Sequence, residues 1–594
     1  MKQFFKMFFA SLLAMIVAGV IVFGVIIGMI VSAVSSATEA KAPTAVTSGS
    51  VLYIDLQSQI HEVGEENPFA FLTNEGAYSP GLYDIVRAIE YAETDDKVEG
   101  MVLRLNPSPN GWATLQQLRQ AVAGFKQSGK FVYAYGEIIT QNAYYVATAA
   151  DSIYLNPVGG IELKGFATVL AFFKGTLDKL EIEPEIFYAG KFKSATEPFR
   201  LKQMSEENKQ QIAEFQSDFW KEFTTAVAQK MNTDASGVAK IAAEGSIEFP
   251  EDAKKYGLVD GLKYADEVED LIREKTGKTS DEDIKLVQIS EYVDNVKRHY
   301  SKTGDKIAVL YAEGAIVDGE SNDDYQVASK TMAKTIREIR KDDNIKAVVL
   351  RVNSPGGSAL ASEVIYRELE LLKKEKSLVV SMGDVAASGG YYISSGADSI
   401  FAMPNTITGS IGVFTILMNV EKLMNNRLGI TFDEVKNAPY ADFPSGLRPL
   451  TAEEQQKVQR SVDWVYNTFK SRVAKGRSMT VGEVDEIAQG RVWTGTDAVS
   501  NGLVDAIGDL DRAINSAATL SGLEDYAVVT YPEPVDRLQT ILKNMKNSPG
   551  MAAAIQEGLK AGMSEEYKLI KQVKMLKSMN GQSMMLMPFS IEVK

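Results

Sequence analysis

Apolar and polar positions along the chain follow two patterns, one typical of buried strands and the other of helices. Apolar runs rich in β-branched residues at positions 347–352 and 377–382 predict strands, whereas the spacing at 362–374 predicts a helix. Because such strands and helices alternate along the chain, the pattern predicts an α/β fold.

The longest apolar stretch lies at the N-terminus. From position 7 to position 34 no residue is charged, and these 28 positions exceed the roughly 20 that cross a bilayer as a helix. A secretory signal has a shorter apolar region, of about 7 to 15 residues, although small residues at 32–40 leave cleavage open. Lys2 and Lys6 precede the stretch and favour a cytoplasmic N-terminus. We expect residues 1–45 to form one transmembrane anchor, with the remainder on the periplasmic or extracytoplasmic side.

The two halves of the chain resemble each other. Downstream of position 100, seven residues of the first half recur in the second at a constant offset of 247 positions, which indicates a tandem repeat. They are Arg104, Asn106, Tyr144, Tyr145, Asp151, Pro157 and Gly165, which pair with Arg351, Asn353, Tyr391, Tyr392, Asp398, Pro404 and Gly412.

Weaker matches on both sides define the extent of the repeat. Positions 51–54 resemble 309–312 at an offset of 258, so the first half carries about 11 extra residues near 65–78. Positions 257–260 match 502–505, and Thr451 with Glu454 predicts a capping box at a helix start opposite Ser205. We expect a first repeat at 46–300, a second at 301–530 and a helical C-terminal extension at 531–594. The charged stretch 273–306 is typical of a connector, and the Met-rich tail at 584–587 suggests only a packing role.

Composition excludes several classes of function. The formal net charge is −15, with no long basic cluster, which argues against nucleic acid as a partner. Cysteine is absent, so thiolate nucleophiles and sulfur metal sites are excluded, and we expect no metal and no cofactor. The two histidines, His61 and His299, are not near a candidate nucleophile motif, which disfavours a Ser-His-Asp site.

Ser388 is the best candidate for a nucleophile. It follows a predicted strand and precedes a predicted helix, where free N–H groups and the helix dipole stabilise developing negative charge. An ordinary helix N-cap is the alternative interpretation. A second glycine pair, Gly356 and Gly357, follows the strand at 347–352 and offers N–H groups for an oxyanion hole, although a simple turn has the same pattern.

Comparison of the halves favours the catalytic interpretation for the second half only. The position paired with Gly356 is Pro109, which has no N–H group, and the position paired with Ser388 is Gln141. The first half therefore lacks both a nucleophile and a donor.

A serine needs a base, and without a nearby histidine the candidates are carboxylates or a lysine of lowered pKa. Lys191 and Lys193 lie in an apolar, small-residue segment and are expected to share one face of a strand, so spacing does not choose between them. Surface lysines with exposed amines remain the alternative.

These motifs together resemble signal peptide peptidase A of the long, tandem-repeat bacterial type. The resemblance rests on positions 353–357, 383–392, 408–412 and 190–199 and covers nearly the whole chain. It implies that Ser388 is the nucleophile, that Lys193 is the general base and that Ser410 orients the lysine. The N–H groups of Gly356 and Gly389 are then expected to form the oxyanion hole.

The same resemblance implies two tandem domains of the crotonase and Clp-protease-like type, built from repeated β-β-α units. It further implies a homotetramer at the bacterial inner membrane that hydrolyses cleaved signal peptides and other apolar peptides. Since the base lies in the first half and the nucleophile in the second, neither half is expected to act alone. We expect both residues of one site to come from the same chain, although pairing between chains stays open.

Two other classes of function remain. Crotonase-type enzymes with this fold act on acyl-CoA thioesters, so a hydratase or an acyl-CoA hydrolase is the enzymatic alternative. A non-catalytic membrane scaffold needs only the anchor and the repeat. The pairing of a serine with a lysine disfavours both.

Overall fold

The computed structural model describes residues 46–66, 78–279, 281–296, 304–320, 325–532 and 581–587. The predicted anchor at 1–45 lies outside the described residues. Among the helices within these ranges, none is long and apolar enough to cross a membrane.

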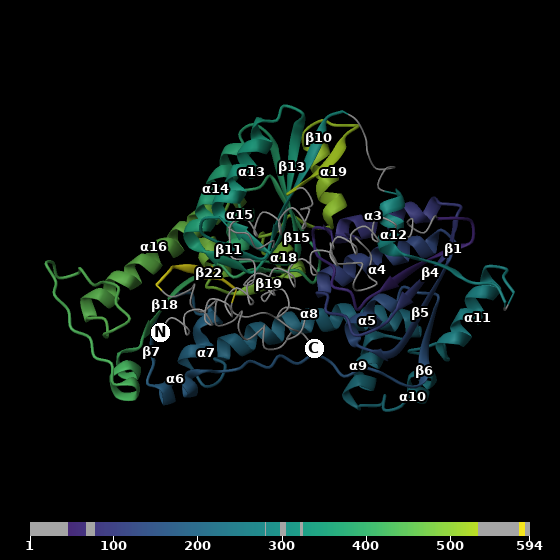
Figure 1. The fold of residues 1–594 in the computed structure, drawn as a ribbon, viewed down its shortest axis with the longest axis horizontal. Coiled ribbons are helices and arrows are strands. Elements are labelled where there is room, and N and C mark those ends of the chain that lie inside the picture. Colours follow the sequence, from purple (N-terminus) through teal and green to yellow (C-terminus); the bar gives the residue numbers. More distant parts are fainter. Residues whose placement is uncertain are drawn as a thin grey trace, which may run out of the picture.

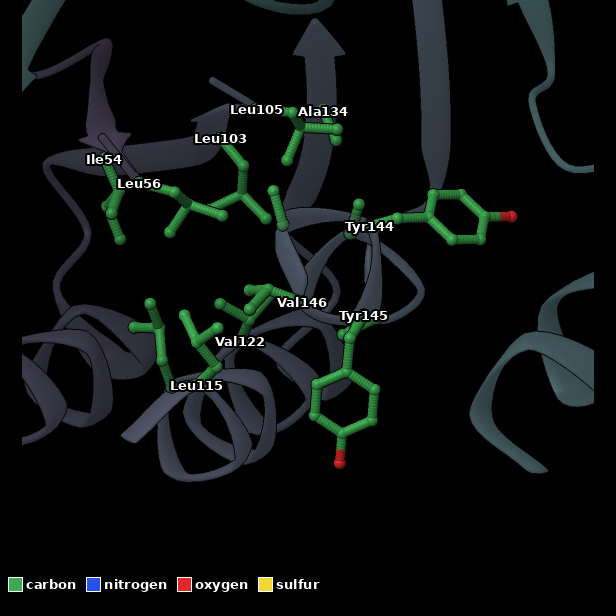
Figure 2. Packing of buried hydrophobic residues seen from close by; sticks show 14 of the residues in the cluster. Ile54, Leu56, Leu103, Leu105, Leu115, Val122, Ala134, Tyr144, Tyr145 and Val146 are labelled. Carbon is green, nitrogen blue, oxygen red and sulfur yellow. The ribbon is translucent and has the colours of Figure 1, made fainter. Parts of the chain in front are cut away.

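The first repeat is built around a parallel sheet whose strands lie in the order β8-β6-β5-β4-β1-β9. Its bounds are β1 (Ser50–Asp55), β4 (Val98–Arg104), β5 (Phe131–Ile139), β6 (Ser152–Ile161), β8 (Gly261–Leu262) and β9 (Lys285–Gln288). Helices pack on it, among them α3 (Leu82–Thr94), α4 (Trp112–Gln127), α5 (Gln141–Ala147), α11 (Ala265–Lys275) and α12 (Ile289–Val296). Figure 2 shows apolar side chains of the strands, such as Ile54 and Leu103, facing Leu115 and Val122 of α4. Strand β1 covers the strand-like positions 51–54, and its apolar residues, like those of β4, are mostly buried, as is typical of a parallel sheet covered by helices.

The second repeat has the same plan. Its sheet runs in the order β19-β17-β15-β13-β10-β21, and β16 joins at β15. The strands are β10 (Lys306–Glu313), β13 (Ile345–Ser354), β15 (Ser377–Ala387), β16 (Ser399–Ala402), β17 (Ile407–Gly409), β19 (Val492–Thr494) and β21 (Ala527–Tyr531). Helices α13 (Ser329–Lys341), α14 (Ala359–Leu372), α15 (Gly389–Ser394) and α19 (Leu510–Leu520) follow the predicted order of elements.

Equivalent hydrogen bonds recur in the two repeats. The phenol of Tyr144 donates to the carbonyl of Leu258 at 2.6 Å, and its counterpart Tyr391 donates to the carbonyl of Leu503 at 2.8 Å. These are the positions that the sequence comparison pairs. The repeat seen in the sequence is therefore also present in the structure, including these buried hydrogen bonds of the core.

Two long helices, each of 26 residues, also correspond: α8 (Glu206–Met231) and α16 (Ala452–Arg477). Thr451 and Glu454 form the predicted capping box of α16, and Ser205 caps α8 through the N–H of Asn208. Helix α8 lies against both repeats, since Glu222 accepts from Tyr145 of the first repeat and Asp218 from Thr494 of the second.

A third sheet contains strands from distant parts of the chain, in the order β12-β11-β14-β22-β18-β7. Its strands are β7 (Glu183–Ala189), β11 (Ala315–Val317), β12 (Gln326–Ala328), β14 (Gly356–Ser358), β18 (Val413–Asn419) and β22 (Met584–Leu586). Figure 1 shows β7, with α6 (Lys174–Leu180) and α7 (Glu197–Arg200), beside elements of the second repeat rather than beside β5 and α5. An arm of the first repeat therefore reaches into the second.

Two expectations about chain segments differ from the structure. Much of the predicted connector at 273–306 belongs to the first repeat, because β9 pairs with β1 and the side chains of Tyr292, Val293 and Val296 in α12 are buried. The predicted helical extension does not hold for residues 581–587, where Met584–Leu586 is a strand. The rest of that extension beyond Pro532 lies outside the described residues, as does most of the predicted insertion, of which only the short pair β2 (Glu65–Glu66) and β3 (Tyr78–Ser79) is described.

One buried ion pair links the two halves. Glu62 of the first half binds Arg351 of β13 through two contacts of 2.8 and 3.1 Å, and both side chains are nearly inaccessible. Arg351 also donates to Ser381 and to the carbonyl of Met382. Its counterpart Arg104 instead pairs with a half-exposed Glu137. The buried pair therefore fixes the first half against the strand that leads to Gly356.

We predict that Arg351→Met destabilises the chain by about 3–5 kcal/mol, because it leaves the carboxylate of Glu62 buried without a partner. Arg104→Met is the matched control and should cost less than about 1 kcal/mol, since its ion pair is exposed. Urea denaturation of both variants measures the difference. Equal losses would show that the buried pair does not join the halves energetically.

Candidate active site

Ser388 lies at a sharp turn between β15 and α15. Its backbone has φ 57° and ψ −114°, a combination that is strained for a residue with a side chain. Its N–H donates to the carbonyl of Gly409 at 2.8 Å, and its carbonyl accepts from Tyr392 at 2.8 Å. The hydroxyl does not cap the helix. The N-cap interpretation therefore fails, and the side chain is left free to make other contacts.

The amine of Lys193 lies against this hydroxyl. Its Nζ is 2.9 Å from Oγ of Ser388, 3.0 Å from Oγ of Ser410 and 3.1 Å from the carbonyl oxygen of Ser410. All three residues are fully buried, with 0% exposure. Within the described part of the chain, no carboxylate forms an ion pair with Lys193.

Burial without a counterion lowers the pKa of the Lys193 amine well below its usual range, since removal from water disfavours the charged form. A neutral amine has a lone pair and accepts a proton from a hydroxyl at this distance. The three predicted residues Ser388, Lys193 and Ser410 are thus brought together by a single chain.

The structure also separates the two candidate lysines. Strand β7 ends at Ala189, so Lys191 and Lys193 do not share a strand face, and that expectation was wrong. Lys191 is exposed and lies over the ring of Phe192, whereas Lys193 points into the interior. A turn that follows β7, with Gly190 at φ 104°, reverses the direction of the chain at this point.

A segment of the second half holds the turn that carries Lys193. The N–H of Phe192 donates to the carbonyl of Gln489 at 2.8 Å, and the N–H of Ser410 donates to the carbonyl of Arg491 at 2.7 Å. A Cβ placed on Gly490 would lie 2.7 Å from Cβ of Lys193. Residues 489–491 therefore set the position of both the lysine and Ser410. Sequence reasoning missed them, because the φ of 75° and the close approach that require a glycine at position 490 are visible only in the structure.

Gln211 of α8 supports the same turn from the other side. Its amide nitrogen donates to Oγ of Ser194 at 2.9 Å and to the carbonyl of Phe192 at 3.3 Å, and its carbonyl oxygen accepts from the N–H of Val492 at 3.3 Å. This side chain is fully buried. Such a polar residue was not identifiable from local patterns, because its role is to join the turn at 192–194 to Val492, 281 positions away in sequence.

Three glycines lie beside Ser388. The N–H of Gly356 is 3.2 Å from Oγ of Ser354, so this predicted oxyanion donor has a partner within its own loop. A Cβ on Gly389 would lie 3.1 Å from the backbone nitrogen of Gly357, so these two glycines pack closely. The oxyanion role of Gly356 and Gly389 stays a prediction, and the structure adds Gly357 as a candidate.

The equivalent positions in the first repeat carry different residues. Gln141, at the position of Ser388, accepts from the N–H groups of Lys164 and Gly165 and donates to the carbonyl of Gly165. Leu163, at the position of Ser410, is buried in the core. The first repeat therefore uses this position to close a loop.

A buried amine of lowered pKa on the hydroxyl of a strained serine, with glycines beside it, is typical of acyl-transfer enzymes that use a serine. Comparison with known proteins gives the family. A profile described as Peptidase family S49 matches residues 124–278 and 370–524, and a Clp protease profile matches 298–408. The chain belongs to peptidase family S49, with one match in each repeat.

Relatives extend this similarity over almost the whole chain. Protease 4 of Haemophilus influenzae is 35% identical over 565 residues, which is 91% of this chain and 91% of that protein. Serine protease SPPA, chloroplastic, of Arabidopsis thaliana is 32% identical and covers 89% of this chain and 77% of that protein. Putative signal peptide peptidase SppA of Enterococcus faecium is 39% identical over 230 residues, 38% of this chain and 67% of that protein. The predicted relationship to the tandem-repeat type is confirmed.

We predict that Gly490→Ala damages the site by displacing Lys193. The new Cβ would meet the backbone and Cβ of Lys193 at 2.7 Å, in addition to the strain of a positive φ, so we expect a loss of about 2–4 kcal/mol in the free energy of unfolding. Gly522→Ala is the matched control, because its φ of 66° is similar and nothing lies within 4 Å. It should cost only about 1 kcal/mol. Thermal and urea denaturation compare the two, and similar losses would argue against close packing at Gly490.

Proposed function

We propose that this protein is a membrane-anchored serine endopeptidase in which Ser388 is the nucleophile and Lys193 the general base. Its substrates are signal peptides released from preproteins and other apolar peptides. The observation that carries the proposal is the fully buried amine of Lys193 at 2.9 Å from the hydroxyl of Ser388, with no counterion among the described residues.

The mechanism follows from this contact. Neutral Lys193 accepts the proton of Ser388, and the alkoxide attacks the peptide carbonyl. Backbone N–H groups of Gly389 and of the pair Gly356 and Gly357 hold the oxyanion. The amine side of the peptide leaves with the proton from Lys193, and an acyl-enzyme remains on Ser388. Lys193 then deprotonates a water molecule, which releases the acid and restores the serine.

Ser410 has a positioning role in this scheme. Its hydroxyl and carbonyl oxygens lie 3.0 and 3.1 Å from Nζ of Lys193. Two N–H groups of the neutral amine donate to these oxygens, which leaves its lone pair directed toward Ser388. Neither group carries a charge, so neither raises the pKa of the amine as a carboxylate would. These two contacts therefore orient the amine of Lys193 without adding a negative charge that would favour its protonated form.

The substrate class rests on the relative named a putative signal peptide peptidase and on the apolar cluster around β18, which includes Phe414 and Ile416. An extended peptide binds to a sheet through main-chain hydrogen bonds, and apolar pockets select its side chains. A crotonase-type acyl-CoA enzyme and a non-catalytic scaffold are the alternatives. Labelling of Ser388 by a fluorophosphonate probe favours the protease over both.

Attachment to the membrane and assembly are further parts of the proposal. The uncharged stretch at 7–34 supports a single-pass anchor in the bacterial inner membrane, with the repeats on the extracytoplasmic side. An irregular arm at 428–447 exposes apolar side chains, among them Ile430, Phe432 and Val435, which supports contact with another surface. The proposed number of four subunits rests on the family resemblance alone. The distance of 2.9 Å within one chain supports a site formed by a single chain.

We predict that Ser388→Ala and Lys193→Ala each lower kcat/KM for an apolar peptide by at least about a thousandfold, because each removes one partner of the proton transfer. Lys191→Ala is the matched control two residues away and should retain at least about a third of the activity, since Lys191 is exposed. Rates come from mass-spectrometric mapping of peptide cuts. Equal losses of activity in Lys191→Ala and Lys193→Ala would show that the assignment of Lys193 as the base is wrong.

We predict that kcat/KM rises with pH and reaches its plateau well below pH 10.5, the ordinary pKa of a lysine. Burial lowers the pKa of Lys193, and the amine acts as a base only when neutral, so activity is lost as the pH falls through that lowered pKa. The rate of fluorophosphonate labelling of Ser388 should follow the same curve. A rate that falls as the pH is raised from about 6 to about 9 would contradict a lysine base.

A further inference from the structure

Helix α4 of the first repeat has no side-chain cap of its own. Its N-cap residue is Gly111, which has no side chain to accept from the free N–H groups of the first turn. The equivalent helix of the second repeat, α14, begins after Ser358, whose hydroxyl accepts from the N–H of Ala361 at 3.2 Å. Gly111 and Ser358 are separated by 247 positions, which is the offset of the repeat. The two equivalent helices therefore satisfy their first turns in different ways.

The cap of α4 comes from Asp384 of the second repeat. One oxygen of its carboxylate accepts from the N–H of Thr114 at 2.9 Å, and the other accepts from the hydroxyl of Thr114 at 2.6 Å. Thr114 is the third residue of α4, the position whose N–H an N-cap side chain normally binds. The helix dipole also favours a negative charge at this end. Asp384 therefore does for α4, from another repeat, what Ser358 does for α14.

The missing side chain at Gly111 makes room for this carboxylate. A Cβ at position 111 would lie 2.2 Å from Cγ of Asp384 and 2.4 Å from each of its carboxylate oxygens. The backbone of Gly111 has φ −73° and ψ 164°, a conformation that residues with side chains adopt freely. The approach of Asp384, and not the backbone conformation, therefore explains the glycine.

The contact is specific to one of the two repeats. The position equivalent to Asp384 in the first repeat is Glu137, which pairs with Arg104 and has a side chain that is 54% exposed. Helix α14 is capped by its own Ser358 and receives no such carboxylate. The second repeat therefore caps a helix of the first, and the reverse contact is absent at α14.

The end of β15 connects Asp384 to the two serines of the site. Residues 385–387 of β15 pair with 407–409 of β17, directly before Ser388 and Ser410. The N–H of Ser388 extends this ladder, because it donates to the carbonyl of the last residue of β17 at 2.8 Å. A displacement of Asp384 is therefore transmitted along β15 and β17 to both serines.

Other groups of the first half hold the same segment. A Cβ on Gly383 would lie 2.5 Å from the carboxylate of Glu62, and the carbonyl of Gly383 accepts from the hydroxyl of Thr406 at 2.8 Å. The N–H of Asn405 donates to the side-chain carbonyl of Gln116 in α4 at 3.4 Å. Helix α4 thus contacts the end of β15 and the loop before β17, at the border between the repeats (Figure 1).

We propose that Asp384 is a positioning residue, which caps α4 of the first repeat and thereby fixes the end of β15 so that Ser388 is aligned with Lys193. The inference rests on the proposed function, in which Ser388 is the nucleophile. It gives the first repeat a second contribution to the site, separate from the arm that carries Lys193. One contribution supplies the base, and the other holds the strand that carries the nucleophile.

The first test removes the contact from each side in the full chain. Asp384→Ala should lower the rate at which a fluorophosphonate probe labels Ser388 by at least about tenfold, because a small misplacement of reacting groups is costly. The loss in peptide hydrolysis should fall on kcat rather than on KM. Thr114→Val, which removes only a hydroxyl of the first repeat, should lower labelling at least about threefold. Glu137→Ala is the matched control at the equivalent position and should retain at least about a third of the rate.

The second test separates positioning from helix stability. Gly111→Ser is added to Asp384→Ala, so that the new hydroxyl caps α4 as Ser358 caps α14. Urea denaturation should show that the double variant regains at least about half of the midpoint lost in Asp384→Ala. Labelling and kcat should stay at the level of Asp384→Ala, because a cap within α4 does not hold β15.

Recovery of labelling together with stability in the double variant would overturn the inference, since the cap would then act on the fold alone. Labelling of Thr114→Val at the rate of the parent would overturn it as well, and this variant decides the question if the double variant does not regain stability. Both results leave the peptidase function intact. A parent chain that neither reacts with the probe nor hydrolyses peptides would contradict the proposed function itself, and with it the role of Asp384.

Discussion

The desolvated amine of Lys193 is the constraint on which the site depends. A lysine without a counterion remains neutral only if water is kept away from it, and this requires cover from every side. The turn after β7, Gly490 and Ser410 supply that cover from both halves of the chain. Strand β7 pairs with β18 in the third sheet, and the turn at its end brings Lys193 to Ser388.

Duplication explains how two halves of similar fold contribute different groups. Gln141, the first residue of α5, and Ser388, the residue before α15, hold the equivalent position in the two repeats, and each repeat has a long helix of 26 residues. In the first repeat the arm that carries Lys193 leaves its own sheet and pairs with β18. The first repeat therefore contributes Lys193 to the site of the second repeat, and it has Gln141 at its own equivalent of Ser388.

Much of the fold was predictable because it follows from local sequence patterns. The strands at 347–352 and 377–382, the capping box of Thr451 and the paired tyrosines Tyr144 and Tyr391 all follow from spacing and internal similarity. The choice of Lys193 over Lys191 did not follow from spacing, because it depends on a turn at Gly190. Gly490 contacts Lys193, β22 pairs with β14 and β18, and Gln211 joins Ser194 to Val492; each of these contacts links distant parts of the chain, and no local pattern identifies the partners.

Dryness of the base and access for a substrate make opposite demands on the site. Ser388 and Lys193 have no exposed surface, and admission of water to the amine would raise its pKa toward the ordinary value. Strand β22 belongs to this cover, because it pairs with β14 on one side and with β18 on the other. A substrate that replaces water as it binds meets both demands, since the amine then stays out of contact with solvent while the hydroxyl of Ser388 is engaged.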